Sequence, residues 1–218
     1  MIPVIAIDGP SASGKGTVAQ RVAEKLGFNY LDSGALYRIV ALSAQLRGIS
    51  EMDEKALSHL SKSLHIEFKE SKVIVNNQDV TDLIRSEECG IFASKIAAVK
   101  SVRDALMTVQ HQFKQKPGLV ADGRDMASVV FPEAILKIFL TASSEIRAQR
   151  RYNQLINKGI SANIKALLQD IVERDHRDLT RKESPLKQTL DAHFLDTSAL
   201  TIDQAVNQVL QWFSGVSK

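Results

Sequence analysis

A glycine-rich loop directly behind a short apolar run is the feature that most constrains the fold of this chain. Residues 4–7 (VIAI) are followed by GPSASGKGT at 9–17, and this order of buried strand, glycine turn and lysine is typical of a loop that binds phosphates. The glycines let backbone amides turn inward without a Cβ in the way, and the following helix presents its positive N-terminal end to an anion. The pattern predicts a nucleoside triphosphate site formed by Gly9, Pro10, Ser11, Ala12, Ser13, Gly14, Lys15, Gly16 and Thr17.

The lysine of this loop and the residue behind it bear on phosphate and metal binding. Lys15 is expected to reach the outer phosphates as a point charge. Ser or Thr usually follows the lysine, whereas Gly16 stands here and the hydroxyl belongs to Thr17. We therefore expect the phosphates to hold Mg²⁺, with Thr17 or Asp122 contributing through water. Asp122 ends a predicted apolar strand, where an acidic residue can hold Mg²⁺ directly or through water.

The hydrophobic pattern predicts an α/β fold, because short apolar segments alternate with helical ones in the order typical of a parallel sheet. Each predicted strand is brief and apolar, as a strand covered on both faces should be. Strands are expected near 3–7, 28–31, 119–121, 135–140 and 194–196. Helices are expected at 15–26, at 33–46 and from Ala199 onward.

One stretch breaks this alternation. Residues 65–69 (HIEFK) and 72–76 (KVIVN) alternate in polarity, with Glu70 and Ser71 between them, and this pattern is typical of a small antiparallel hairpin. An Asn-Asn turn signal follows, ahead of a third short strand. We interpret 62–82 as a β insertion outside the main sheet.

Length and composition fit a single globular domain. The chain has 218 residues, of which 44% are hydrophobic, and this is enough to bury a core. The N-terminus has no basic leader and its apolar run ends at Asp8, so we expect no signal peptide, no membrane span and a cytoplasmic location. Cys89 is the only cysteine, which excludes an internal disulfide and a cysteine zinc site. The net charge of +3 is too close to balance to indicate a nucleic-acid partner.

Two motifs follow predicted strands and are expected at the carboxyl edge of the sheet, where open α/β sheets bind ligands. The first, LDSGALYR, contains Ser33, Tyr37 and Arg38. Ser33 is also expected to cap the helix and Tyr37 also fits the core, so this motif alone leaves a purely structural role open. The second, ADGRDM, contains Arg124 and Asp125. The alternative to a ligand-binding role for this motif is an ordinary Asp-rich turn.

Taken together, these motifs resemble the bacterial cytidylate kinases, which are nucleoside monophosphate kinases. The resemblance rests on GPSASGKGT, LDSGALYR, ADGRDM followed by VVFP, and ERDHRDLTR, and it spans nearly the whole chain. It implies a three-layer P-loop fold with a five-stranded parallel sheet, a β insertion at 62–82 and a mobile helical lid. The implied organisation is one kinase domain over 1–218, with its core at 1–61, 83–149 and 166–218 and its lid at 150–165.

The resemblance also implies an activity and a site. The activity is the ATP-dependent, in-line phosphorylation of CMP and dCMP to CDP and dCDP with Mg²⁺, by a monomer with no nucleic-acid or membrane partner. The catalytic residues would be Lys15, Arg150 and Arg174, and ATP would bind at 9–17. The acceptor nucleotide would be bound by Ser33, Tyr37, Arg38, Ser94, Arg103, Arg124, Asp125, Arg174, Asp178 and Arg181.

Two other functions stay open at this point. One is a P-loop kinase for another small acceptor, namely UMP, AMP, dTMP or shikimate. The other is a binding module that uses a nucleotide as a switch and hydrolyses it without an acceptor. The sequence has no basic strip interleaved with aromatic residues and no long tail, which argues against the switch.

Overall fold

The computed structural model describes residues 2–69 and 72–216, and the chain divides into two compact units. The first unit consists of residues 1–31 and 113–218, and the second consists of residues 32–112. The β insertion expected at 62–82 is therefore one part of a larger unit. The single kinase domain and the lid boundaries at 150–165 stay predictions.

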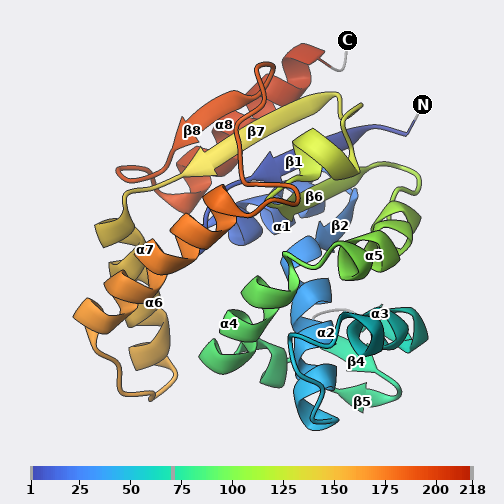
Figure 1. The fold of residues 1–218 in the computed structure, drawn as a ribbon. Coiled ribbons are helices and arrows are strands. Elements are labelled where there is room, and N and C mark those ends of the chain that lie inside the picture. Colours follow the sequence, from blue (N-terminus) through green and yellow to red (C-terminus); the bar gives the residue numbers. More distant parts are fainter. Residues whose placement is uncertain (1, 70–71, 217–218) are drawn as a thin grey trace. The chain divides into compact units, whose positions relative to one another are not determined.

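The first unit contains a five-stranded sheet (Figure 1). Its order is β2–β6–β1–β7–β8, and the pairings of β1 with β6, of β1 with β7 and of β7 with β8 are parallel. The expected strands are confirmed, with their ends shifted by at most two residues. The strands are β1 (Val4–Asp8), β2 (Asn29–Asp32), β6 (Leu119–Gly123), β7 (Leu136–Thr141) and β8 (His193–Asp196).

Helices α1 (Lys15–Leu26) and α8 (Ile202–Val216) lie side by side in this unit (Figure 1). Val18 and Val22 of α1 and Val206 and Val209 of α8 are buried in one apolar core with side chains from β1, β6, β7 and β8. Gly27 ends α1 with a φ of 65°, a left-handed conformation that favours glycine. The P-loop is therefore joined to a strand and a helix that are both fixed by the core.

Helices α6 (Ser144–Asn157) and α7 (Ile164–Thr180) pack against each other in the same unit. Ser143 caps α6, and the Asn163 side chain caps α7 by accepting from the N–H groups of Lys165 and Ala166. The expected lid segment thus consists of the second half of α6, a short connection and the start of α7.

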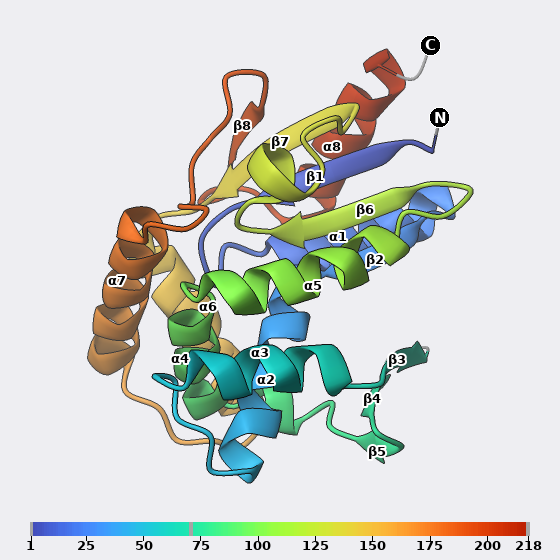
Figure 2. The same cartoon turned by 45° about the vertical axis from the view of Figure 1, so that its right-hand side comes forward.

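The second unit is mainly helical (Figure 2). Helix α2 packs against α4, and α3 lies alongside α5. A three-stranded antiparallel sheet, β3–β4–β5, confirms the expected insertion, although its Glu70–Ser71 turn lies outside the described residues. The elements are α2 (Ser33–Leu46), α3 (Glu54–Ser63), β3 (Ile66–Lys69), β4 (Lys72–Val75), β5 (Gln78–Asp79), η1 (Leu83–Arg85), α4 (Glu87–Ile96) and α5 (Lys100–Gln112).

The start of α2 corrects one expectation. The Asp32 side chain, and not Ser33, caps this helix, since Asp32 Oδ1 accepts from the N–H of Ala35 at 2.9 Å. Asp is as good a cap as Ser, so the residue one position earlier takes that role. The Ser33 hydroxyl instead donates to Gln110 Oε1 at 2.7 Å inside the unit.

Among the described residues, no helix combines the length and the apolar character that a membrane span requires.

Candidate active site

The P-loop between β1 and α1 has the geometry of an anion site. Gly14 adopts a φ of 93° and Ala12 a φ of 57°, so the backbone turns sharply just before α1 begins. The loop fits tightly against β7, since a Cβ on Gly9 would lie 1.9 Å from the Leu140 carbonyl oxygen. The buried hydroxyls of Ser11 and Ser13 have no hydrogen-bond partner within the described part of the chain. Two unsatisfied donors at a helix N-terminus fit the oxygens of a phosphate.

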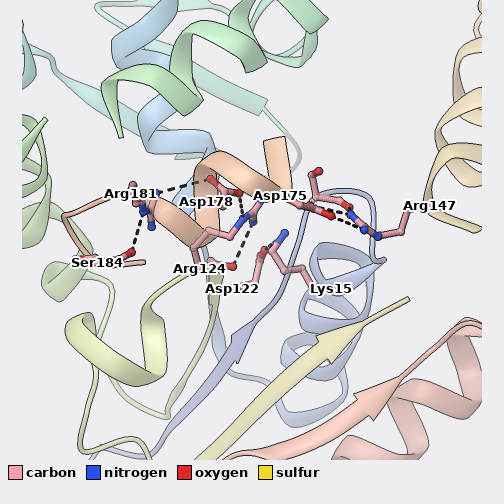
Figure 3. Close-up of polar contacts among 10 residues, drawn as sticks. Lys15, Asp122, Arg124, Arg147, Asp175, Asp178, Arg181 and Ser184 are labelled. Atoms are coloured by element: carbon pink, nitrogen blue, oxygen red, sulfur yellow. Dashed lines mark hydrogen bonds and ion pairs between the residues drawn. The ribbon is translucent and has the colours of Figure 1, made fainter. Parts of the chain in front are cut away.

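Lys15 lies at the end of this loop and faces a buried carboxylate (Figure 3). Its Nζ is 3.8 Å from Oδ2 of Asp122, whose other oxygen accepts from the Tyr30 hydroxyl at 2.6 Å. Asp122 lies on β6 opposite Ile7 of β1, which is why the two parallel strands bring it to the P-loop. The expected proximity of Asp122 to the phosphate loop is therefore present. The described residues contain no cluster of three or more His, Cys, Asp or Glu side chains that could hold a metal ion by themselves.

A buried aspartate joins two of the expected arginines (Figure 3). Asp178 Oδ2 accepts from Nε of Arg124 at 2.8 Å, and its Oδ1 is 3.9 Å from Nη1 of Arg181. Arg181 also donates to the Ser184 carbonyl oxygen at 2.8 Å. Three expected site residues, one directly after β6 and two at the C-terminal end of α7, therefore form one cluster.

The charges of this cluster stabilise one another. Burial alone would raise the pKa of Asp178, but the guanidinium groups of Arg124, Arg174 and Arg181 hold it below its ordinary value. Burial alone would lower the pKa of Arg124, but Asp178 and, to a smaller extent, Asp122 raise it. The carboxylates and guanidiniums therefore stay charged in a buried environment, as the recognition of a phosphate dianion requires.

A second arginine–aspartate pair was not predicted from the sequence. Arg147 of α6 forms a bidentate pair with Asp175 of α7, at 3.0 Å and 2.5 Å. The same guanidinium donates to the carbonyl oxygens of Ala142 at 2.9 Å and Ser11 at 3.2 Å, so it ties both helices to the P-loop. In the sequence Arg147 is one of three arginines close together, with Arg150 and Arg151, and no local pattern identifies Asp175 as its partner.

Arg150 contacts the P-loop one turn farther along α6. Its Nη1 donates to the Ser13 carbonyl oxygen at 2.9 Å and its Nη2 to the Thr197 carbonyl oxygen at 2.6 Å. Beside these groups lies a cavity of about 520 Å³, which the P-loop residues 12–18 line on one side. Side chains that follow β8 in the sequence, including Leu200 and Ile202, supply an apolar wall of this cavity. This wall was not predicted, because the sequence around it carries no nucleotide-binding pattern.

The second unit contains the other expected site residues. The Arg103 guanidinium carbon lies 5.6 Å from the centre of the Tyr37 ring, and its Nη1 donates to the Ala97 carbonyl oxygen at 3.1 Å. Arg38 donates to the carbonyl oxygens of Ile84 at 2.7 Å and Ser86 at 3.0 Å. Helices α2 and α5 thus bring Tyr37 and Arg103 together, while Arg38 is held by carbonyl groups of η1 and of the residue that caps α4.

Two more expected residues are buried. Ser94 lies on α4 in the second unit and Asp125 follows β6 in the first. Asp125 immediately precedes a short π-helical turn, η2 (Met126–Val130), and makes no side-chain cap of it. Turns of this kind occur often at functional sites.

The chain is similar to a known family over nearly its full length. The family model described as cytidylate kinase matches residues 5–214. The chain is 58% identical over 212 residues to a cytidylate kinase of Chromobacterium violaceum, which covers 97% of this chain and 96% of that protein. A cytidylate kinase of Polynucleobacter asymbioticus is also 58% identical, over 97% of this chain and 96% of that protein.

A solved structure supports the fold. A gluconokinase from Sinorhizobium meliloti 1021 matches with a TM-score of 0.53 at 16% identity, over 99% of this chain and 93% of that one. At this identity the likeness concerns the fold alone.

Proposed function

The chain belongs to the cytidylate kinase family and phosphorylates CMP with ATP, and we propose that dCMP is a second acceptor and that Mg²⁺ acts with the ATP. The observation that carries the site assignment is the continuous cluster of Lys15, Asp122, Arg124 and Asp178 (Figure 3). It links the lysine of the phosphate loop to arginines that suit a second phosphate. The kinase for another acceptor and the nucleotide switch are not favoured by the family match.

ATP binds with its phosphates on residues 9–17 in this proposal. The cavity beside Arg150 takes the adenosine, since it combines an apolar wall with polar groups and adjoins the loop. Lys15, Arg150 and Arg174 are the proposed catalytic residues. Little covalent chemistry is required of the protein, because the acceptor phosphate is itself the nucleophile.

Electrostatics explain why the site needs so many cations. Two phosphate groups of charge about −2 at about 5 Å repel each other by about 13 kcal/mol at an effective dielectric of 20. Lys15 and the arginines of the buried cluster offset this repulsion, and they stabilise the charge that develops on the transferred group.

The residues around the loop fit a magnesium ion. Mg²⁺ in kinases is typically bound by one or two carboxylates together with substrate phosphates and water. Asp122 supplies one buried carboxylate near Lys15, and Thr17 lies on the adjoining cavity. In this proposal the phosphates would hold the ion, with Thr17 or Asp122 contributing through water, and its charge would offset that of the phosphates.

The proposed roles of the acceptor-binding residues follow the resemblance to the family. Ser33, Arg38 and Arg124 bind the phosphate. Arg174 and Asp178 approach the ribose and phosphate, and Arg181 supports them. Cytosine presents an amine donor beside an acceptor nitrogen, so a carboxylate at Asp125 and a guanidinium at Arg103 match it, whereas uracil reverses that polarity. Ser94 also faces the cytosine in this proposal, and Tyr37 forms a wall of the site.

Three remaining features are part of the proposal. A lid at 150–165 excludes water from the γ-phosphate, because an open site would hydrolyse ATP. The enzyme is proposed to be monomeric, and to be cytoplasmic because its nucleotide substrates are.

A panel of acceptors tests the proposed function. Purified protein is incubated with ATP, Mg²⁺ and one acceptor at a time, and ADP release is coupled to an optical readout while the nucleotide products are separated by chromatography. CDP and dCDP are expected as products, and UMP, AMP, dTMP and shikimate are expected to react far more slowly. ADP release that is independent of any acceptor, or faster with one of the other acceptors, would overturn the proposal.

A glycine on α4 offers a separate test of Arg38. Gly90→Ala is expected to raise the KM for CMP by about tenfold, the order expected for a hydrogen bond to a charged group, because its Cβ would lie 2.7 Å from Nη2 of Arg38 and displace the guanidinium. Stability should change little, since Ala favours a helix over Gly by about 1 kcal/mol, which offsets the hydrogen bonds that Arg38 loses to the carbonyl oxygens of Ile84 and Ser86. The measurement is steady-state kinetics together with thermal melting.

Gly215→Ala on α8 is the matched control, because a Cβ there meets no heavy atom of the described residues within 4 Å. Its KM for CMP should equal that of the unmodified enzyme. A folded Gly90→Ala variant with the same KM would argue against phosphate binding by Arg38.

A further inference from the structure

Asp8 is a buried carboxylate that the reaction described above does not use. It ends β1 and is 1% exposed. Its two oxygens accept one hydrogen bond each from the backbone, Oδ1 from the N–H of Met126 and Oδ2 from the N–H of Ala127, both at 2.8 Å. These are the first two residues of η2, and the residue before them makes no side-chain cap. Asp8 therefore caps this turn from a different strand.

The position of Asp8 on the sheet makes this contact rigid. Asp8 lies opposite Gly123 of β6 in the parallel register, so its side chain reaches the chain that leaves β6. The next residue, Gly9, is pressed against β7 so closely that a Cβ would lie 1.9 Å from the Leu140 carbonyl oxygen. The backbone that carries Asp8 consequently has little room to move.

The contact joins two parts of the site. The P-loop begins directly after Asp8, and Arg124 and Asp125 lie between β6 and the turn that Asp8 caps. A carboxylate suits the position because it presents two acceptor oxygens to two N–H groups, whereas an amide of the same shape presents only one. Hydrogen bonds to a charged acceptor are also the stronger ones.

We propose that Asp8 is a positioning residue for acceptor recognition, and that its carboxylate holds the turn that orients Arg124 and Asp125 relative to the P-loop. This inference rests on the proposed function, in which Arg124 and Asp125 bind CMP. Asp8 acts through these residues and does not itself touch a substrate.

The environment of Asp8 makes the contact sensitive to pH. Burial raises the pKa of Asp8 to about 7, and the charge of Asp125 acts in the same direction, while the two N–H bonds and the charge of Arg124 oppose the rise. Its register neighbours on the two adjoining strands, Gly123 and Phe139, carry no charge. A protonated Asp8 loses one acceptor, so recognition of CMP weakens as the pH falls below about 7.

Asp8→Asn tests this role by separating the two substrates. The KM for CMP should rise by about tenfold or more, as for the loss of a hydrogen bond to a charged group, whereas the KM for ATP should stay within about twofold because the P-loop keeps its own contacts. The dependence of kcat/KM for CMP on pH should lose one titration near neutrality. The phosphate of CMP also titrates in this range. Because this titration is the same for the unmodified enzyme and for Asp8→Asn, the difference between their two pH profiles reports the protonation of Asp8.

Asp191→Asn is the control, because it makes the same substitution at an exposed carboxylate paired with Lys137. It should leave both KM values and the pH profile unchanged. Unmodified enzyme that fails to turn over CMP would count against the proposed function. Normal turnover, with equal CMP constants and equal pH profiles in a folded Asp8→Asn variant, would instead overturn the role of Asp8.

A measurement on the unmodified protein keeps the proposal testable if Asp8→Asn does not fold. The amide proton shifts of Met126 and Ala127 are followed by NMR between pH 5.5 and about 8.5, a range that brackets the pKa of Asp8. Both should titrate together with a midpoint near pH 7. Two amides that do not respond to pH over this range would overturn the inferred pH sensitivity of this contact.

Discussion

Lys15→Met is expected to lower kcat for CMP phosphorylation by about 10³-fold while the protein stays folded, which is the order found when one preorganised donor to a reacting group is removed. Nζ of Lys15 lies at the phosphate loop, and its side chain is only 12% exposed. Methionine keeps most of the aliphatic stem but removes the charge that stabilises the transferred phosphoryl group. The measurement is steady-state turnover at saturating CMP and ATP.

Lys137→Met is the matched control for this prediction. Lys137 lies on β7 in the same sheet, its side chain is 11% exposed, and its Nζ is 2.7 Å from Oδ2 of Asp191. The same loss of charge at an equally buried lysine should leave kcat unchanged, because Lys137 has no part in the proposed site. A Lys15→Met enzyme that keeps more than about a tenth of its kcat would contradict the role assigned to Lys15.

The features that the sequence predicts well are local. The phosphate loop follows from glycine spacing behind a strand, and the five strands follow from short apolar runs. Motifs at the ends of parallel strands converge at one edge of a sheet, so the order of the motifs along the chain is enough to predict that Asp122 lies near Lys15. The physical reason is that backbone geometry and strand direction determine these positions.

Helices α4 and α5 show where the hydrophobic pattern fails. The buried face of α5 contains Arg103 and Gln110 beside Val102 and Leu106, so polar residues interrupt its apolar stripe. The buried face of α4 is made largely of small residues, including Gly90, which give little hydrophobic signal. A pattern that equates buried with apolar cannot identify such helices.

Contacts between distant residues are the other part that the sequence does not predict. Arg147 finds its partner Asp175 only because α6 and α7 pack together. Asp8 looks like the end of an apolar run, yet it caps a turn more than a hundred residues later. The choice of Asp32 over Ser33 as the cap of α2 is similar, because two neighbouring residues of equal capping ability cannot be ranked from sequence.

Asp178→Asn is expected to lower the free energy of unfolding by about 3 kcal/mol or more at pH 7.5, which is the order for a buried ion pair that loses one partner. The Asp178 side chain is 5% exposed and accepts from Arg124 at 2.8 Å, so its loss leaves guanidinium charge without a buried counter-charge. Turnover of CMP should fall as well, because the same carboxylate orients Arg124. Urea denaturation measures the first effect and steady-state kinetics the second.

The pH dependence of this loss has a definite sign. Burial acts to raise the pKa of Asp178, but Arg124, Arg174 and Arg181 together hold it below the ordinary value of 3.8. A carboxyl with a lowered pKa in the folded state stabilises the protein above its unfolded pKa, and that contribution disappears as the pH falls through the folded value. The difference in free energy of unfolding between the unmodified protein and Asp178→Asn should therefore be complete at neutral pH and shrink only below about pH 4.

Asp191→Asn is the control for this prediction. At a carboxylate whose side chain is 62% exposed, it should cause only a small fraction of the same loss. Equal losses in the two variants would show that burial beside the arginines is not what makes Asp178 important.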